Sequence, residues 1–75
     1  MKTYPTTDFY LTSYLRAAGF PMVETERDGY RLTFVFANTA ALQAQVERYF
    51  NGTATVAPNA MAAAIRDLKS MIHRT

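Results

Sequence analysis

Apolar positions recur at helical spacing near the start of the chain. They follow one another at i, i+3, i+4 and i+7, and they are Leu11, Tyr14, Leu15 and Ala18. Because residues at this spacing share one face of a helix, the segment Asp8–Ala18 is expected to be helical with that face toward a core. Thr6 or Thr7 would cap its N-terminus, and Gly19 would end it in a left-handed turn.

Two further helices are predicted from the same spacing in the second half of the chain. Asn38 or Thr39 would cap the first of them, and the Asn-Gly pair that ends at Gly52 would terminate it. Its inward positions would be Leu42, Val46, Tyr49 and Phe50. Pro58 suits the first position of the last helix. The buried stripe of that helix would be Met61, Ala64, Ile65, Leu68 and Ile72.

Between the first two helices the pattern changes to strand-like alternation. The runs Met22–Arg27 and Tyr30–Phe36 flank the dipeptide Asp28-Gly29, which is a strong signal for a two-residue hairpin turn of type I′. This turn would set Glu26 opposite Arg31 as a cross-strand ion pair. The inner face of the hairpin would then carry Val23, Thr25, Tyr30, Leu32, Phe34 and Phe36.

A short β-leaning segment, Thr53–Val56, precedes the last helix and is a candidate third strand beside the first hairpin strand. A chain of 75 residues leaves no room for a second domain. The sequence therefore predicts one α+β domain over residues 1–75, in the order α-β-β-α-(β)-α. In this domain a β-hairpin, with or without a third strand, packs against three helices.

Four stretches of the chain resemble one family of small domains. They are a Thr-Asp-Phe-Tyr-Leu helix start within Tyr4–Gly19, a Phe-Val-Phe strand within Leu32–Asn38, a Tyr-Phe-Asn-Gly helix end within Val46–Gly52, and the segment Val56–Ile72, which ends in Leu-Lys-Ser-Met-Ile. The family is classed as a domain of unknown function and occurs in bacterial and viral proteins. The resemblance implies a fold but no activity. It also suggests phage or mobile-element surroundings, where small accessory proteins act on nucleic acid or on host proteins.

Composition narrows the classes of function. The chain has no cysteine, so it has neither a disulfide nor a thiolate metal site, which fits a cytoplasmic protein. Eight basic and six acidic residues give a net charge of +2, too little for a dedicated nucleic-acid binder. The start of the chain lacks a signal-peptide pattern, and no apolar stretch approaches the ~20 residues of a membrane span. We expect no membrane association.

Residues for catalysis are not found in any usable combination. His73 is the single histidine, and no second ligand lies at metal-binding spacing from it. Glu24 and Glu26 share a strand face, but the predicted pairing with Arg31 makes them a surface ion-pair cluster. We therefore expect no enzyme activity, no cofactor, no metal ion and no small-molecule substrate.

One candidate binding surface is aromatic and consists of Phe9, Tyr10 and Tyr4. Phe9 lies opposite the apolar face of the first helix, because successive residues are separated by about 100°. In a domain this small, such a ring either packs under another part of its own chain or contacts a partner. This surface favours a protein-interaction module, either a homodimer or an accessory protein that binds a larger protein.

A second candidate surface is basic and consists of Arg66, Lys69 and His73. These residues share the face of the last helix that lies opposite its apolar stripe. Such a row, together with Lys2, Arg16 and Arg74, could follow the phosphates of DNA or RNA. The alternative interpretation is therefore a nucleic-acid-associated module.

Overall fold

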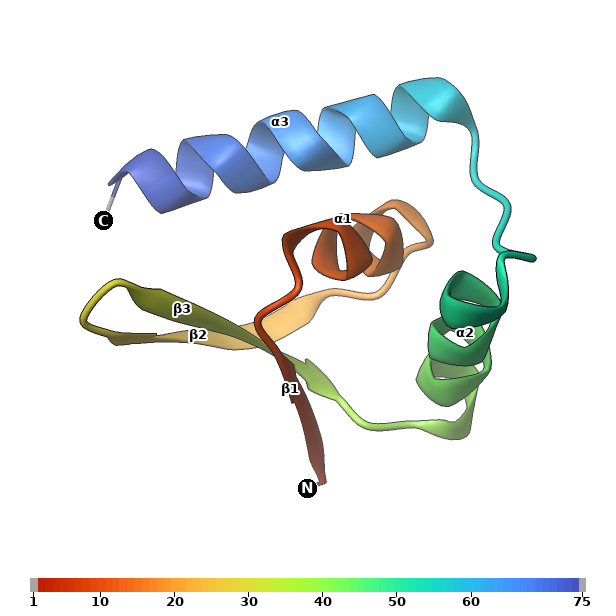
Figure 1. The fold of residues 1–75 in the computed structure, drawn as a ribbon, viewed down its shortest axis with the longest axis horizontal. Helices are drawn as coiled ribbons and strands as arrows, with labels where there is room; N and C mark the ends of the chain where they lie inside the picture. Colours follow the sequence, from red (N-terminus) through yellow and green to blue (C-terminus); the bar gives the residue numbers. More distant parts are fainter. Residues whose placement is uncertain (1, 75) are drawn as a thin grey trace.

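The computed structural model describes residues 2–74 and contains three strands and three helices (Figure 1). In chain order they are β1 (Thr3–Thr6), α1 (Phe9–Ala17), β2 (Met22–Asp28), β3 (Arg31–Ala37), α2 (Ala40–Asn51) and α3 (Pro58–Arg74). The strands form one antiparallel sheet in the order β1-β3-β2. The predicted fold class, a small α+β domain with a sheet against three helices, is confirmed.

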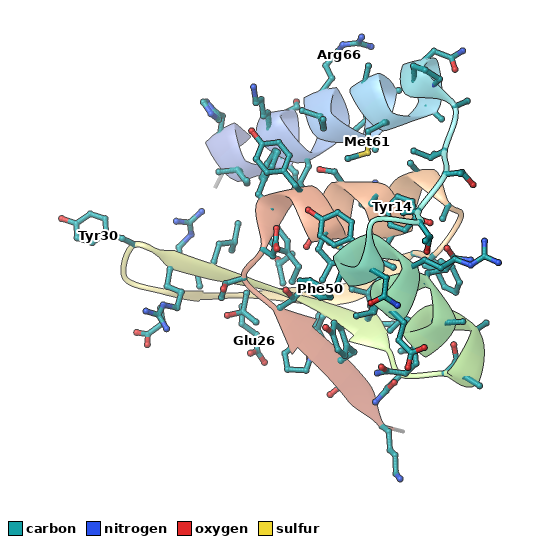
Figure 2. The ribbon with its side chains drawn as sticks, turned by 45° about the vertical axis from the view of Figure 1, so that its right-hand side comes forward. Tyr14, Glu26, Tyr30, Phe50, Met61 and Arg66 are labelled. Atoms are coloured by element: carbon teal, nitrogen blue, oxygen red, sulfur yellow. The ribbon has the colours of Figure 1, made fainter. Side chains whose placement is uncertain are left out.

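The helices lie on one side of the sheet, with α1 between the sheet and α3 and with α2 beside α1 (Figure 1). The core between them consists of Leu11, Tyr14, Leu15, Phe34, Phe36, Leu42, Val46 and Leu68. Glu26 points from the opposite face of the sheet, away from the helices (Figure 2). The amphipathic stripes predicted for the three helices therefore meet over one face of the sheet.

The third strand comes from the N-terminus and not from Thr53–Val56, so that part of the prediction was wrong. β1 pairs with β3, with Thr3 opposite Ala37 and Thr6 opposite Phe34. Its Pro5 concealed the strand in the sequence, because proline lacks a backbone donor and is confined to edge strands. The segment Thr53–Val56 is instead an unpaired connection whose Ala54 and Val56 rest against the core.

The hairpin exists, but its turn lies one residue later than predicted. Asp28, and not Glu26, lies opposite Arg31, so the turn residues are Gly29 and Tyr30. Gly29 has a φ of 63°, whereas Tyr30 has no positive φ. Since a type I′ turn requires positive φ at both positions and a type II′ turn only at the first, the turn is of type II′. The predicted Glu26–Arg31 pair was wrong.

A β-bulge between Met22 and Glu24 changes which residues of β2 face the core, compared with the prediction. Met22 lies opposite Phe36 and packs against the core, whereas Val23 is exposed. Val23 and Tyr30 were both predicted to point inward, and both predictions were wrong: Val23 lies at the bulge, and Tyr30 is a fully exposed residue of the hairpin turn. A bulge adds one residue to one strand, so it reverses the alternation beyond it.

The ends of α1 are fixed by hydrogen bonds to backbone groups. Asp8 is the N-cap, and its Oδ1 accepts hydrogen bonds from the backbone N–H groups of Tyr10 and Leu11, both at 3.0 Å. The prediction of Thr6 or Thr7 as the cap was wrong. Thr6 instead accepts a hydrogen bond from the Asp8 N–H at 3.1 Å. An aspartate at this position both satisfies the free N–H groups and places a negative charge at the positive end of the helix dipole.

The C-terminal end of α1 has the predicted form. The N–H of Phe20 donates to the carbonyl of Leu15, and that of Gly19 donates to the carbonyl of Arg16, both at 3.0 Å. These are the two hydrogen bonds of a Schellman motif. The predicted cap of α2 at Thr39 is also confirmed, since its hydroxyl accepts from the Leu42 N–H at 3.1 Å.

Replacing Gly29 with valine should lower the free energy of unfolding by about 1–3 kcal/mol, the cost of forcing a β-branched residue into a positive-φ conformation. A Cβ at Gly29 would meet no atom within 4 Å, so the effect comes from backbone strain and not from a clash. Urea denaturation measures the change. Tyr30→Val in the same turn is the control, expected to stay within about 0.5 kcal/mol of the wild type. Equal effects of the two substitutions would contradict the turn assignment.

Candidate functional site: an aromatic ridge on α1 and α2

Four aromatic side chains lie on α1 and α2. We call Tyr10, Tyr14, Tyr49 and Phe50 the aromatic ridge. The ring centroids of Tyr14 and Tyr49 are 5.8 Å apart, and those of Tyr49 and Phe50 are 5.3 Å apart at an interplanar angle of 87°. Such separations are favourable for aromatic pairs. Tyr10 is one helical turn from Tyr14 on α1, and its ring packs edge-to-face on Phe9, with centroids 5.3 Å apart.

The middle of the aromatic ridge is fixed, whereas its two ends are open. The Tyr14 hydroxyl donates a hydrogen bond to Gln45 Oε1, which joins α1 to α2, and the Tyr14 side chain is buried. Tyr10 at one end keeps 59% of its surface exposed, and Phe50 at the other keeps 65%. Figure 2 shows Tyr14 on α1 and Phe50 near the end of α2. The ridge thus presents two exposed rings on a packed base.

The exposed position of Phe50 corrects the sequence prediction, which placed it inward. Tyr49 agrees with the prediction, since it is half-buried against the core. Phe50 is one residue further and therefore about 100° around the helix, at the border of the apolar stripe set by Leu42 and Val46. The unusual signal in the sequence was two adjacent aromatic residues at a helix end, because they cannot both face the same core.

An acidic group lies beside the aromatic ridge. Burial raises the pKa of the Tyr49 hydroxyl above the usual 10.0, and the negative charge of Asp8, followed by that of ionised Tyr10, raises it further. The Asp8 carboxylate is held at the start of α1 by the hydrogen bonds that it accepts from the N–H groups of Tyr10 and Leu11. Asp8 is half-buried at the start of α1.

The raised pKa of Tyr49 should be visible in a pH titration. The unfolded chain loses this proton near 10.0 and the folded chain at higher pH, so the folded state binds more protons between the two values. The contribution of Tyr49 to stability is therefore complete below pH 10 and declines as the pH rises through the folded pKa. Absorbance at the tyrosinate band should show one late-titrating tyrosine that Tyr49→Phe removes. An unchanged titration curve in that variant would contradict the assignment.

The remaining aromatic candidates, Phe9 and Tyr4, are half-buried and pack against the core of their own chain. Phe9 lies on the same side of α1 as Thr12 and Ser13, which are fully buried, and α1 packs against α3. Their hydroxyls donate to the carbonyls of Asp8 and Phe9, at 2.8 and 3.0 Å, whereas Nη1 of Arg16 is buried without a hydrogen-bond partner among the described residues. Of the three predicted residues, Tyr10 alone is largely exposed.

Phe9→Ser is expected to destabilise the domain by about 2–4 kcal/mol, within the range for shortening a packed aromatic side chain and below that of a fully buried one. Chemical denaturation measures the loss. Tyr10→Ser provides the control on the adjacent position, where the exposed ring contributes much less. If Phe9→Ser left stability intact and changed the mass of the protein in solution, Phe9 would be an interface residue instead.

The basic candidates Arg66, Lys69 and His73 are all exposed on α3. Arg66 points away from α1 into solvent (Figure 2). The three residues therefore form the predicted row along the outer side of α3, and the exposed Asp67 lies about 100° around the helix from Arg66. The row is separate from the aromatic ridge, which lies between α1 and α2.

A small apolar cavity of about 240 Å³ opens beside the start of α2. Its lining consists of Phe20, Pro21, Val23, Phe36, Ala37, Thr39 and Leu42. The hydroxyl of Thr39 already accepts the capping hydrogen bond of α2. The cavity therefore lacks the convergent polar groups that orient a small ligand.

Neither a metal site nor a membrane span is present in the described part of the chain. Within residues 2–74, no three side chains of His, Cys, Asp or Glu are placed to hold a metal ion. No helix among these residues is long and apolar enough to cross a bilayer.

Comparison with known proteins gives one match. A family model, the domain of unknown function DUF5659, covers residues 1–74. The chain belongs to this family. The match confirms the resemblance that the sequence motifs indicated. No curated protein and no solved structure matches the chain significantly. The DUF5659 description assigns no activity.

Proposed function

We propose that the chain is a small, non-enzymatic protein-interaction module that binds its partner through the aromatic ridge. The supporting observation is that Tyr10 and Phe50 expose more than half of their surface while the rings beneath them are packed and hydrogen-bonded. Tyrosine and phenylalanine bury large areas on binding and lose little conformational entropy. Aromatic anchors of this kind often supply most of the binding free energy at interfaces.

The arrangement of the rings supports binding more than a role in folding. Single exposed apolar side chains are common on proteins, but here each exposed ring packs edge-to-face on a half-buried one, Phe50 on Tyr49 and Tyr10 on Phe9. The hydrogen bond between Tyr14 and Gln45 holds α1 and α2 together beneath them. A preorganised surface of this kind avoids part of the entropic cost of association. The phage or mobile-element setting and the cytoplasmic location are further predictions from the sequence.

The test compares a double alanine variant of the aromatic ridge with a single alanine variant elsewhere on the surface. Tyr10→Ala combined with Phe50→Ala removes the exposed rings of the aromatic ridge. Tyr30→Ala, the control, removes a fully exposed ring at the hairpin tip, far from the ridge (Figure 2). The double variant should bind its partner at least about a hundredfold more weakly than the wild type. The loss would be seen as a missing co-purifying protein or, if the partner is a second copy, as a missing dimer in sedimentation. Equal retention by both variants, or equal loss, would contradict the proposal.

A second candidate function is nucleic-acid binding by the outer side of α3. The observation that favours it is the exposed row of Arg66, Lys69 and His73. If this row contacts phosphates, affinity for DNA or RNA should fall linearly with the logarithm of salt concentration. Arg66→Ala with Lys69→Ala should then reduce the slope by about two contacts. A lack of measurable binding at about 50 mM salt, where electrostatic binding is strongest, would remove this candidate.

A further inference from the structure

The carboxylate of Asp8 is only partly used by the fold. Its Oδ1 accepts both capping hydrogen bonds, from the N–H groups of Tyr10 and Leu11. Its Oδ2 accepts no hydrogen bond from the described residues. Asp8 is also followed closely in the chain by Tyr10, an exposed end of the aromatic ridge. One carboxylate oxygen is therefore open to a partner beside an exposed aromatic ring.

A partner that covers the aromatic ridge must also meet this negative charge. A purely apolar surface would remove water from Asp8 without replacing its hydrogen bonds, which is costly for a charged group. Phosphates of a nucleic acid would be repelled by it. A cation, in contrast, is attracted both by the carboxylate and by the negative face of an aromatic ring. The charge at the ridge thus selects a basic group on the partner.

Among basic side chains, arginine fits this combination best. Its planar guanidinium can stack on the Tyr10 ring and still donate a hydrogen bond in the plane of the group toward Asp8 Oδ2. Lysine carries a compact, strongly hydrated charge that does not stack. The aliphatic part of an arginine side chain would also find apolar contact on the ridge.

We propose that the aromatic ridge recognises an arginine side chain of a partner protein, with Asp8 as its counter-charge and Tyr10 as its stacking surface. This inference rests on the proposed function, since it names the chemistry of the partner at the same surface. Tyr49 and Phe50, whose ring centroids are 5.3 Å apart, offer further apolar surface on the ridge.

The direct test is a backbone amide NMR titration with N-acetyl-arginine amide. The neutral control is N-acetyl-citrulline amide, which has almost the same shape but no charge. The arginine compound should produce saturable shifts at Asp8, Tyr10 and Tyr49, and the citrulline compound should bind at least about tenfold more weakly. Equal binding of the two compounds, or saturable shifts confined to other residues, would overturn the proposal. Binding of N-acetyl-lysine amide as tightly as the arginine compound would also overturn the proposal.

Asp8→Asn separates the charge from the structural role of this residue. Asparagine caps helices about as well as aspartate, so the variant should fold like the wild type while its affinity for the arginine compound falls about tenfold. The partner of the full chain gives the decisive comparison. If Tyr10→Ala with Phe50→Ala loses the partner and Asp8→Asn keeps it, the proposed function stands and the arginine proposal fails. If all variants keep the partner, both fail.

Discussion

Phe36→Ala should lower the free energy of unfolding by about 3–5 kcal/mol, the range for removing a buried aromatic ring. Phe36 is fully buried on the central strand β3, opposite Tyr4 on one side and Met22 on the other. Its removal leaves a void where the sheet meets the helices. A chain of this length has a total stability on the order of 4–11 kcal/mol. Urea denaturation should therefore show a variant that is largely unfolded or close to it.

Phe50→Ala is the matched control, because it removes the same side chain from an exposed position. We expect a change of less than about 1 kcal/mol, since surface substitutions away from the core have small effects. The contrast between the two phenylalanines also tests the site, because a binding residue has to be removable without unfolding the domain. Comparable losses in both variants would show that Phe50 is a core residue, contrary to its position in the structure.

The second large effect is expected at Leu68, the fully buried leucine of α3. Leu68→Ala should cost about 2–5 kcal/mol, as for other buried leucines. Because α3 packs on α1 and α1 packs on the sheet, this loss weakens the layer that covers Thr12 and Ser13. Amide hydrogen exchange should be accelerated first in α3, and thermal unfolding gives the overall change.

Lys69→Ala, at the next position but on the exposed side of α3, should change stability by less than about 0.5 kcal/mol. If Leu68→Ala were equally mild, α3 would not be anchored on α1. Phe9 and the buried hydroxyl residues of α1 would then require another cover, such as a second chain.

The helices were predictable because their side chains repeat with the period of the helix. Leu11 and Leu15, Leu42 and Val46, and Leu68 all occupy the expected inward positions. The C-terminal stop of α1 was also predictable, since Gly19 adopts a φ of 99° that other residues avoid. These features depend on residues close together in the chain, where local geometry determines the outcome.

The strands were harder to predict because their pairing depends on distant partners. β1 contains a proline and has only four residues, so nothing local distinguishes it from an arm. The Asp-Gly pair correctly indicated a hairpin, but the choice between a turn at Asp28-Gly29 and one at Gly29-Tyr30 depends on the whole ladder. The bulge at Val23 has no sequence signal of its own. One inserted residue is enough to exchange the buried and exposed sides.

The candidate site was found only in part from the sequence. Tyr10 was identified as a surface aromatic residue, and it is one exposed end of the ridge. Tyr49, Phe50 and Asp8 were missed as members of the site, because the packing of α1 against α2 brings together residues about forty positions apart. Helical periodicity shows which face of a helix is apolar, but not which other helix that face meets.

Hydroxyl-radical footprinting of the protein bound to its partner tests the central claim most directly. Aromatic rings react readily when exposed, so Tyr10, Phe50 and Tyr30 should all be oxidised in the free chain. In the complex, Tyr10 and Phe50 should be protected while Tyr30, at the distant hairpin tip, stays reactive. Protection of Tyr30 or of His73, with Tyr10 and Phe50 still oxidised as in the free chain, would show that the partner binds elsewhere and would contradict the account.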